Sequence, residues 1–181
     1  MGAGLTLTFD ILDNIAEQKA KALIFLESRQ MQGILSEILQ RRYRMPTPPL
    51  LINGRVSGEK RKTRVNLFQE RAGFDVMLLS PRAGGVGFTL TEANHVIHLS
   101  RWWNPAVEDQ CTDRTYRIGQ RRPVHVYYPM AVHPSYRQHS FDLRLHELLQ
   151  TKRTLSRTVL APPTATGQDV ESLFNTTIGT Q

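Results

Sequence analysis

The residues best suited to do chemistry are three polar side chains within one short stretch, Gln110, Arg114 and Arg117. Their spacing of i, i+4 and i+7 places all three on one face if the stretch is helical. Planar guanidiniums bind phosphate oxygens bidentately, so this stripe would suit a polyphosphate. A solvated, salt-bridged helix face is the alternative, and it explains most charged helices. The motifs that surround this stretch favour the polyphosphate site.

The same stretch carries the signals of a helix at both ends. Asn104 is a good N-cap, and Pro105 suits the first helical position, where no backbone N–H is missed. Gly119 stands where a residue in the left-handed conformation would end the helix. The sequence therefore predicts one helix that begins after Asn104 and ends at Gly119.

A second candidate for phosphate binding is the glycine-rich run Gly84-Gly85-Val86-Gly87. It directly follows the apolar run 76–79, which is expected to be a buried strand. A backbone without side chains can approach a phosphate closely and offer N–H donors to its oxygens. A glycine-rich turn that serves only backbone geometry is the alternative for an isolated run. Beside the other motifs, a phosphate-binding loop is the favoured interpretation.

Five short apolar runs alternate with helical patterns along the chain. The runs expected to form strands are 23–26, 50–52, 76–79, 96–99 and 124–128. The helical patterns cover 9–19, 31–39, 58–71, 104–119 and 138–157. This alternation implies an α/β fold, with a parallel sheet covered by helices on both faces. Ligands of such folds collect at the carboxyl ends of the strands, where the glycine-rich run and the loop before Asn104 should meet.

Composition indicates an ordinary soluble globule that attracts polyanions. The chain has 181 residues, 40% of them hydrophobic and 22% charged, which fits one domain with a sizeable core. Its 23 basic and 16 acidic side chains give a net charge of +7, which would attract nucleic acid. No apolar run approaches the ~18 residues of a membrane span, so no membrane partner is expected. The single cysteine, Cys111, excludes an internal disulfide.

Lys60 and Arg61 belong to a cluster of basic residues in the helix predicted over 58–71. Such a cluster suits the phosphates of DNA, although a solvated helix face explains it equally well. The histidines, in contrast, do not suggest a metal site. His95 and His98 point to opposite faces of a predicted strand, and no second ligand pair occurs at metal-binding spacing. No metal is expected.

The residues 113–120 read Asp-Arg-Thr-Tyr-Arg-Ile-Gly-Gln and resemble motif VI of the Swi/Snf-type DNA translocases, a branch of helicase superfamily two. Earlier segments agree in order and spacing. The segment 79–91 resembles motif V, 102–108 resembles the aromatic motif between V and VI, and 22–27 resembles motif IV. The resemblance covers roughly 15–157. Several ordered motifs are far more specific than any one of them.

The resemblance implies a RecA-like, three-layer α/β lobe with a mainly parallel sheet, and it assigns roles to particular residues. Arg114 and Arg117 would act as arginine fingers on the γ-phosphate of ATP, and Gln110 would orient the site. The other residues expected near the nucleotide are Gly85, Gly87 and Thr89. The residues expected at the backbone of double-stranded DNA are Ser80, Gly84 and Trp103, with Lys60 and Arg61 added for the charge of their helix.

The sequence contains no GxxxxGK(S/T) loop and no acidic strand-end motif that could hold Mg²⁺-ATP. In the family these belong to a first RecA-like lobe. The chain is therefore expected to be a second motor lobe, monomeric and inactive alone, with ATP and Mg²⁺ bound mainly by the N-terminal lobe of the same polypeptide. The expected division is a lead-in over 1–14, the lobe over 15–137, a helix packed on it over 138–160 and a flexible tail over 161–181.

For the whole protein, the resemblance implies a DNA-dependent ATPase that walks along duplex DNA. It would work in the cytoplasm at the bacterial nucleoid, or in the nucleus of a eukaryote. The alternative is a stand-alone module that binds nucleic acid or a partner protein and takes no part in hydrolysis.

Overall fold

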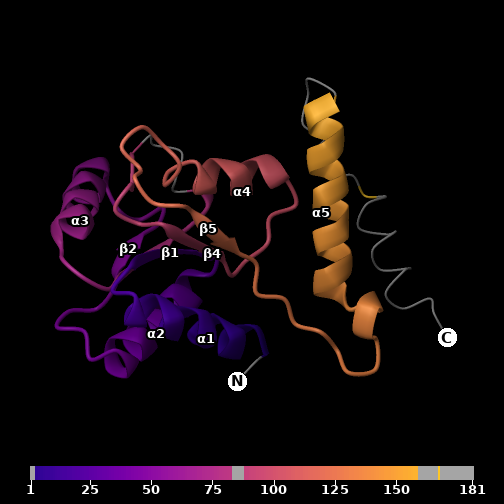
Figure 1. Cartoon of the computed structure of the whole chain (residues 1–181), viewed down its shortest axis with the longest axis horizontal. Helices are drawn as coiled ribbons and strands as arrows, with labels where there is room; N and C mark the ends of the chain where they lie inside the picture. Colours follow the sequence, from indigo (N-terminus) through magenta and orange to yellow (C-terminus); the bar gives the residue numbers. More distant parts are fainter. Residues whose placement is uncertain (1–2, 83–87, 159–166, 168–181) are drawn as a thin grey trace.

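The computed structural model describes residues 3–82, 88–158 and 167. They form a five-stranded sheet in the order β2-β3-β1-β4-β5, in which every pair of neighbouring strands runs parallel (Figure 1). The strands are β1 (Lys21–Phe25), β2 (Leu50–Ile52), β3 (Asp75–Leu79), β4 (His95–His98) and β5 (His125–Tyr127). The five strands predicted from the apolar runs are confirmed.

Helices cover both faces of the sheet, as Figure 1 shows. Helices α1 (Ala3–Glu17) and α2 (Arg29–Arg42) pack on one face. Helices α3 (Gly58–Glu70) and α4 (Pro105–Thr112) pack on the other. The predicted three-layer α/β fold is therefore confirmed.

The last helix, α5 (Phe141–Thr158), follows a short 3-10 helix, η2 (Arg137–His139), and stands beside α4 (Figure 1). Its most extensive contacts with other elements are those with α4 and η2. Among the described residues, no helix is long and apolar enough to cross a lipid bilayer.

The central strands are buried on both faces, which is why they read as continuous apolar runs. In β1, Leu23 and Phe25 belong to the core under α3 and α4, whereas Ile24 belongs to the core under α1 and α2. Phe68 of α3 and Leu12 of α1 are completely buried against these two sides. The sheet therefore holds α4 in a fixed place above the carboxyl ends of β1 and β4.

The first helix begins at Ala3, earlier than the apolar pattern predicted. Phe9 and Leu12 of this helix are buried in the same core as the strands. Of the predicted tail 161–181, the structure describes only residue 167. The division of the chain into lead-in, lobe, helix and tail stays a prediction.

The helix predicted from Asn104 to Gly119 begins where expected and ends early. The side-chain oxygen of Asn104 accepts a hydrogen bond of 3.0 Å from the amide of Ala106, and Pro105 occupies the first helical turn. This start is therefore confirmed. The predicted end at Gly119 is wrong, because α4 ends at Thr112.

Two contacts turn the chain out of the helix after Thr112. The hydroxyl of Thr115 donates to the carbonyl of Thr112 at 2.7 Å, and the amide of Leu90 donates to the carbonyl of Arg114 at 2.8 Å. The Thr112 carbonyl also accepts from the Thr115 amide at 3.0 Å, which tightens the last turn, while the Arg114 carbonyl bonds the remote Leu90. Gly119 does have a left-handed backbone, with a φ of 106°, but it lies in a loop and not at a helix end.

Candidate functional site

The segments that directly follow β3 and β4 lie together at the carboxyl edge of the sheet. The guanidinium of Arg82, after β3, lies 5.2 Å from the centre of the Trp102 ring, after β4. The thiol of Cys111 lies 3.9 Å from the carbonyl oxygen of Pro81. Burial raises the pKa of this thiol to about 11, so the cysteine stays protonated and serves as packing. The glycines predicted to bind phosphate or DNA fall outside the described residues: Gly84, Gly85 and Gly87.

Ser80, a predicted DNA contact, lies at this edge but is 8% exposed. Its hydroxyl oxygen accepts a hydrogen bond of 3.0 Å from the side-chain amide of Gln32 in α2. The same amide donates to the carbonyl of Leu26, and the Gln32 oxygen accepts from Asn53 at 3.0 Å. Ser80 is thus part of a polar network that ties the ends of β1, β2 and β3 together.

Trp103, the second tryptophan of the aromatic motif and a predicted DNA contact, is half-buried beneath α5. It packs against Leu145 and Leu149 of that helix. The ammonium of Lys152, itself 4% exposed, lies 5.9 Å from the centre of its ring. Helix α5 therefore fixes how far the Trp103 side chain reaches into solvent.

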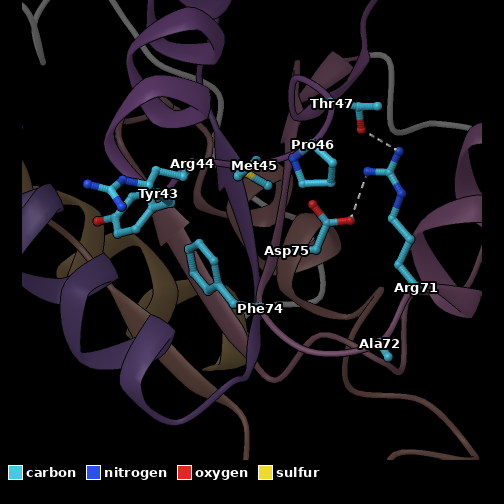
Figure 2. Close-up of a pocket in the computed structure, with 9 residues that line it drawn as sticks. All are labelled: Tyr43, Arg44, Met45, Pro46, Thr47, Arg71, Ala72, Phe74 and Asp75. Carbon is cyan, nitrogen blue, oxygen red and sulfur yellow. Dashed lines mark hydrogen bonds and ion pairs between the residues drawn. The ribbon is translucent and has the colours of Figure 1, made fainter.

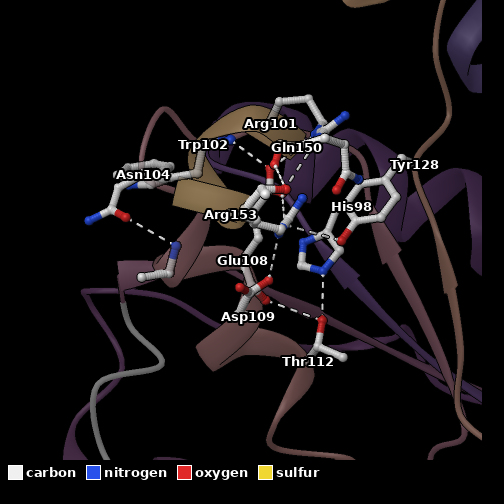
Figure 3. A network of polar contacts seen from close by, with 12 residues as sticks. His98, Arg101, Trp102, Asn104, Glu108, Asp109, Thr112, Tyr128, Gln150 and Arg153 are labelled. Carbon is white, nitrogen blue, oxygen red and sulfur yellow. Dashed lines mark hydrogen bonds and ion pairs between the residues drawn. The ribbon is translucent and has the colours of Figure 1, made fainter. Parts of the chain in front are cut away.

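A buried carboxylate, Glu108 of α4, joins the aromatic stretch to α5 (Figure 3). Its two oxygens accept hydrogen bonds from Arg101 at 3.0 and 3.3 Å, and one of them accepts from the Trp102 amide at 2.9 Å. Arg153 of α5 donates to it at 2.8 Å and reaches Asp109 at 3.0 Å. Burial alone would raise the pKa of the Glu108 carboxyl, but these donors outweigh burial and hold the pKa below its usual value.

An aromatic side chain, Tyr128, packs against the two arginines of this carboxylate network. The guanidiniums of Arg101 and Arg153 lie 4.4 and 5.7 Å from the centre of its ring. His98 stacks on Tyr128 with ring centres 5.1 Å apart and shares a hydrogen bond of 3.1 Å with the Thr112 hydroxyl. Figure 3 shows these groups converging from β4, α4 and α5. The network holds α4 and Trp102 in one arrangement with α5.

Two buried histidines make the fold sensitive to acid. Burial lowers the pKa of both His95 and His98 to about 4, from 6.5. As the pH falls below 6.5, the unfolded chain binds protons that the folded chain does not, so stability is lost. We expect the free energy of unfolding to fall between pH 6.5 and 5, by about 1.4 kcal/mol per pH unit and histidine once the unfolded form is protonated.

Urea unfolding of this chain at a series of pH values measures that slope. The window above pH 5 lies above the titration of ordinary carboxyl groups, near 4, which isolates the histidines. His98→Gln should make the slope shallower, whereas the exposed control His133→Gln should leave it unchanged. A stability that stays constant from pH 6.5 to 5 would contradict this prediction.

Arg114, a predicted arginine finger, lies in the turn after α4 and is 6% exposed. Its guanidinium lies 4.8 Å from the centre of the Phe88 ring, and its carbonyl accepts from Leu90. Thr89, a predicted nucleotide contact, is half-buried and lies between Phe88 and Leu90 in the sequence. Burial, together with the nearby charge of Arg117, lowers the pKa of Arg114. An anion bound there would stabilise the positive charge.

Arg117 and Gln110 differ from Arg114 in exposure. Both side chains are exposed to solvent, Gln110 from α4 and Arg117 from the loop that follows it. The prediction that all three lie on one face of one helix is wrong, because the helix ends before either arginine. The structure instead provides one buried and one exposed guanidinium within a single turn of chain.

The predicted DNA contacts on α3 lie elsewhere on the lobe. Lys60 is exposed, whereas Arg61 is half-buried with its guanidinium 3.5 Å from the carbonyl oxygen of Asn53. Helix α3 lies on the same face of the sheet as α4, at the opposite side of the molecule from α5 (Figure 1). Lys60 therefore lies away from the arginine loop, the segment 113–120 that carries Arg114 and Arg117, and can be varied independently of it.

The described surface is hollowed at several places, two of which bear on the argument. A polar hollow of about 490 Å³ lies beside the arginine loop and is lined by Thr91, Glu92, Gly119, Gln120, Arg121 and Arg122. A more apolar one, of about 350 Å³, lies near the start of β3 between the α2–β2 loop and the α3–β3 turn (Figure 2). Its wall includes Phe74 and an ion pair of 3.1 Å between Arg71 and Asp75. No group of three metal-binding side chains occurs in the part of the chain that the structure describes.

Comparison with known proteins supports the resemblance that the motifs carry. The sequence profile described as "Helicase conserved C-terminal domain" matches residues 7–119, more than half of the chain. The chain belongs to this family. Within it, the chain is a C-terminal lobe of the Swi/Snf type.

Relatives of this Swi/Snf-type lobe occur in bacteria and in eukaryotes, including Homo sapiens. It is 40% identical over 162 residues to the Zorya protein ZorD of Escherichia coli, a match that covers 86% of this chain and 15% of ZorD. It is 36% identical over 169 residues to the putative ATP-dependent helicase/translocase YwqA of Bacillus subtilis, covering 91% of this chain and 17% of YwqA. The chain thus spans about a sixth of these relatives.

A solved structure, the Sulfolobus solfataricus SWI2/SNF2 ATPase core in complex with dsDNA, shares the fold of the Swi/Snf-type lobe. The TM-score is 0.70 at 29% sequence identity, and the match covers 97% of this chain and 35% of that one. The RecA-like architecture implied by the motifs is therefore confirmed.

Two residues at the site of the Swi/Snf-type lobe are not predicted by the motifs. Phe88 was not singled out as the ring under Arg114, and Glu108 was not expected to be buried. A signal for Glu108 does exist, because it stands three residues before the buried Cys111 and so shares its inward helix face. Its partner Arg101 is likewise buried, and the two side chains form an ion pair of 3.0 Å.

Proposed function

We propose that this chain is the second motor lobe of a DNA-dependent ATPase that translocates on duplex DNA. Its own sequence has no GxxxxGK(S/T) loop, so Mg²⁺-ATP would be held mainly by a first RecA-like lobe. The observation that carries the proposal is the pair of arginines after α4, one buried over Phe88 and one exposed. Such a pair can supply positive charge to a triphosphate that is bound mainly by another lobe.

In this proposal the two arginines have different tasks. The exposed Arg117 crosses the cleft and meets the γ-phosphate, where negative charge builds up during transfer. Arg114, held against Phe88, contributes a fixed positive charge behind it. Gln110 is exposed on α4 and would orient the same site. The groups proposed to approach the rest of the nucleotide are Gly85, Gly87 and Thr89.

The DNA contacts in the proposal lie along the carboxyl edge of the sheet and on α3. Ser80 and Gly84 follow β3, Trp103 follows β4, and Lys60 and Arg61 belong to α3. The Sulfolobus relative was solved with duplex DNA, which supports duplex DNA as the substrate here. Phosphate contacts of this kind position the protein without reading sequence.

The isolated 181-residue chain should show no DNA-stimulated ATP hydrolysis, because the cradle for Mg²⁺-ATP is missing. Phosphate release with saturating duplex DNA measures this, with a longer polypeptide that includes a GxxxxGK(S/T) lobe as the positive control. Robust turnover by the chain alone would contradict the proposal. Absence of turnover from the longer polypeptide as well would favour a binding module without catalysis.

A further inference from the structure

The loop after α4 displays two large apolar side chains on either side of Arg117. Tyr116 is 74% exposed, and Ile118 is as exposed as in an extended chain, at 105%. Arg117 between them is also exposed. Ile118 has the highest exposure of the large hydrophobic side chains in the described residues. Scattered exposed apolar residues are common, but here two of them flank one functional arginine.

The loop is held in place by hydrogen bonds at both ends. Thr115 is completely buried, and its hydroxyl donates to the Thr112 carbonyl at 2.7 Å. At the other end, the side-chain amide of Gln120 lies 3.0, 2.8 and 3.2 Å from the carbonyl oxygens of Thr91, Ala93 and Thr115. These anchors mean that the fold itself presents Tyr116 and Ile118 to solvent.

We propose that Tyr116 and Ile118 are docking residues that insert into an apolar surface of the first motor lobe when the cleft closes on ATP. The inference rests on the proposed function, because Arg117 can reach a triphosphate held by the first lobe only if its two neighbours meet that lobe too. The surface they contact would be apolar and would border the triphosphate site.

The chemistry of the loop favours this occupant over DNA. A phosphate backbone offers charge but little apolar surface, so it gains nothing from an aliphatic side chain such as Ile118. Contact with an apolar surface of the first lobe, in contrast, would remove from water the apolar area that the free loop exposes. Burial of that area would occur only in the closed state, so it would favour closing over opening.

The test uses the complete protein with one dye on each lobe, so that energy transfer reports closure as a non-hydrolysable ATP analogue is added. Ile118→Ser and Tyr116→Ser should each raise the analogue concentration needed for half-maximal closure by roughly tenfold, since each removes a large buried apolar contact. The matched control is Val132→Ser, a 50% exposed aliphatic residue away from the loop. It should close like the unaltered protein.

Two further readouts separate docking from misfolding and from DNA binding. The melting temperature and the DNA affinity of both serine variants should stay unchanged, because the two side chains contact solvent in the isolated lobe. Closure at the normal analogue concentration would overturn the inference. Loss of DNA affinity in place of closure would also overturn it and would make DNA the occupant.

An arginine variant distinguishes this inference from the proposed function. If Arg117→Ala keeps full turnover while Ile118→Ser impairs closure, the finger assignment fails and the docking surface stands. If Arg117→Ala loses turnover while Ile118→Ser closes normally, the docking surface fails and the finger assignment stands.

Discussion

Replacing Arg117 with alanine in the complete protein should lower DNA-stimulated ATP hydrolysis by about 10³–10⁵-fold, the usual effect of removing an arginine finger. The arginine acts mainly on charge that develops in the transition state, so ATP affinity and DNA affinity should change little. Arg117→Lys should fail as well, because an ammonium cannot reproduce the planar fork. The measurement is ATPase rate against DNA concentration, with separate affinities for each ligand.

Three other variants serve as controls for this experiment. Arg121→Ala removes an exposed arginine a few residues away and should keep most of the turnover. Lys60→Ala and Arg61→Ala on α3 should weaken DNA affinity and leave turnover at saturating DNA largely unchanged. Arg117→Ala with normal turnover at saturating DNA would show that the finger assignment is wrong.

Arg114→Ala should abolish hydrolysis too, but with a second effect. This side chain is buried against Phe88, so its removal also leaves a cavity in the lobe. A lower melting temperature should therefore accompany the loss of turnover, which is not expected for the exposed Arg117.

Glu108→Ala should destabilise the lobe by about 3–5 kcal/mol, the usual cost of removing one partner from a buried ion pair. The Arg101 and Arg153 side chains are only 7% and 10% exposed, so Arg101 would be left buried without a carboxylate and Arg153 would keep only the half-exposed Asp109. The Trp102 amide would lose its acceptor as well. Urea unfolding of the chain measures the loss.

A matched control for Glu108 lies next to it on the same helix. Asp109 also pairs with Arg153, at 3.0 Å, but its side chain is 50% exposed. Asp109→Ala should therefore lower stability by no more than about 1 kcal/mol, as for ordinary surface ion pairs. Equal and small effects at both positions would show that the buried network does not hold α5 on the lobe.

The sheet was predictable because its strands obey a local rule. A strand buried on both faces is mostly apolar, and Leu23, Ile24 and Phe25 show that pattern in sequence and structure alike. The start of α4 was predictable for the same kind of reason, since Asn104 and Pro105 act on the residues next to them.

The end of α4 depends instead on a partner that is remote in the sequence. The Leu90 amide takes the carbonyl of Arg114, and nothing near residue 112 announces that contact. The motifs single out Arg114 and Arg117 as a pair, and the role of the pair stays a prediction. That one is buried and the other exposed depends on Phe88, which lies in a different motif. Spacing along one segment cannot show such packing.

The burial of Ser80 and Trp103 has a similar cause. Their motif positions place them at the carboxyl edge of the sheet, but Gln32 and α5 decide how much of each side chain meets solvent. These partners come from distant parts of the chain, which a motif does not describe. The roles of Ser80 and Trp103 in DNA binding stay predictions.

The most direct test of the central claim is a structure of the complete protein, bound to duplex DNA and a non-hydrolysable ATP analogue. The account predicts that the Arg117 guanidinium lies about 2.7–2.9 Å from an oxygen of the γ-phosphate, the distance of a charge-assisted hydrogen bond. A closed complex in which Arg117 contacts DNA or solvent, with the γ-phosphate bound only by the first lobe, would contradict the claim.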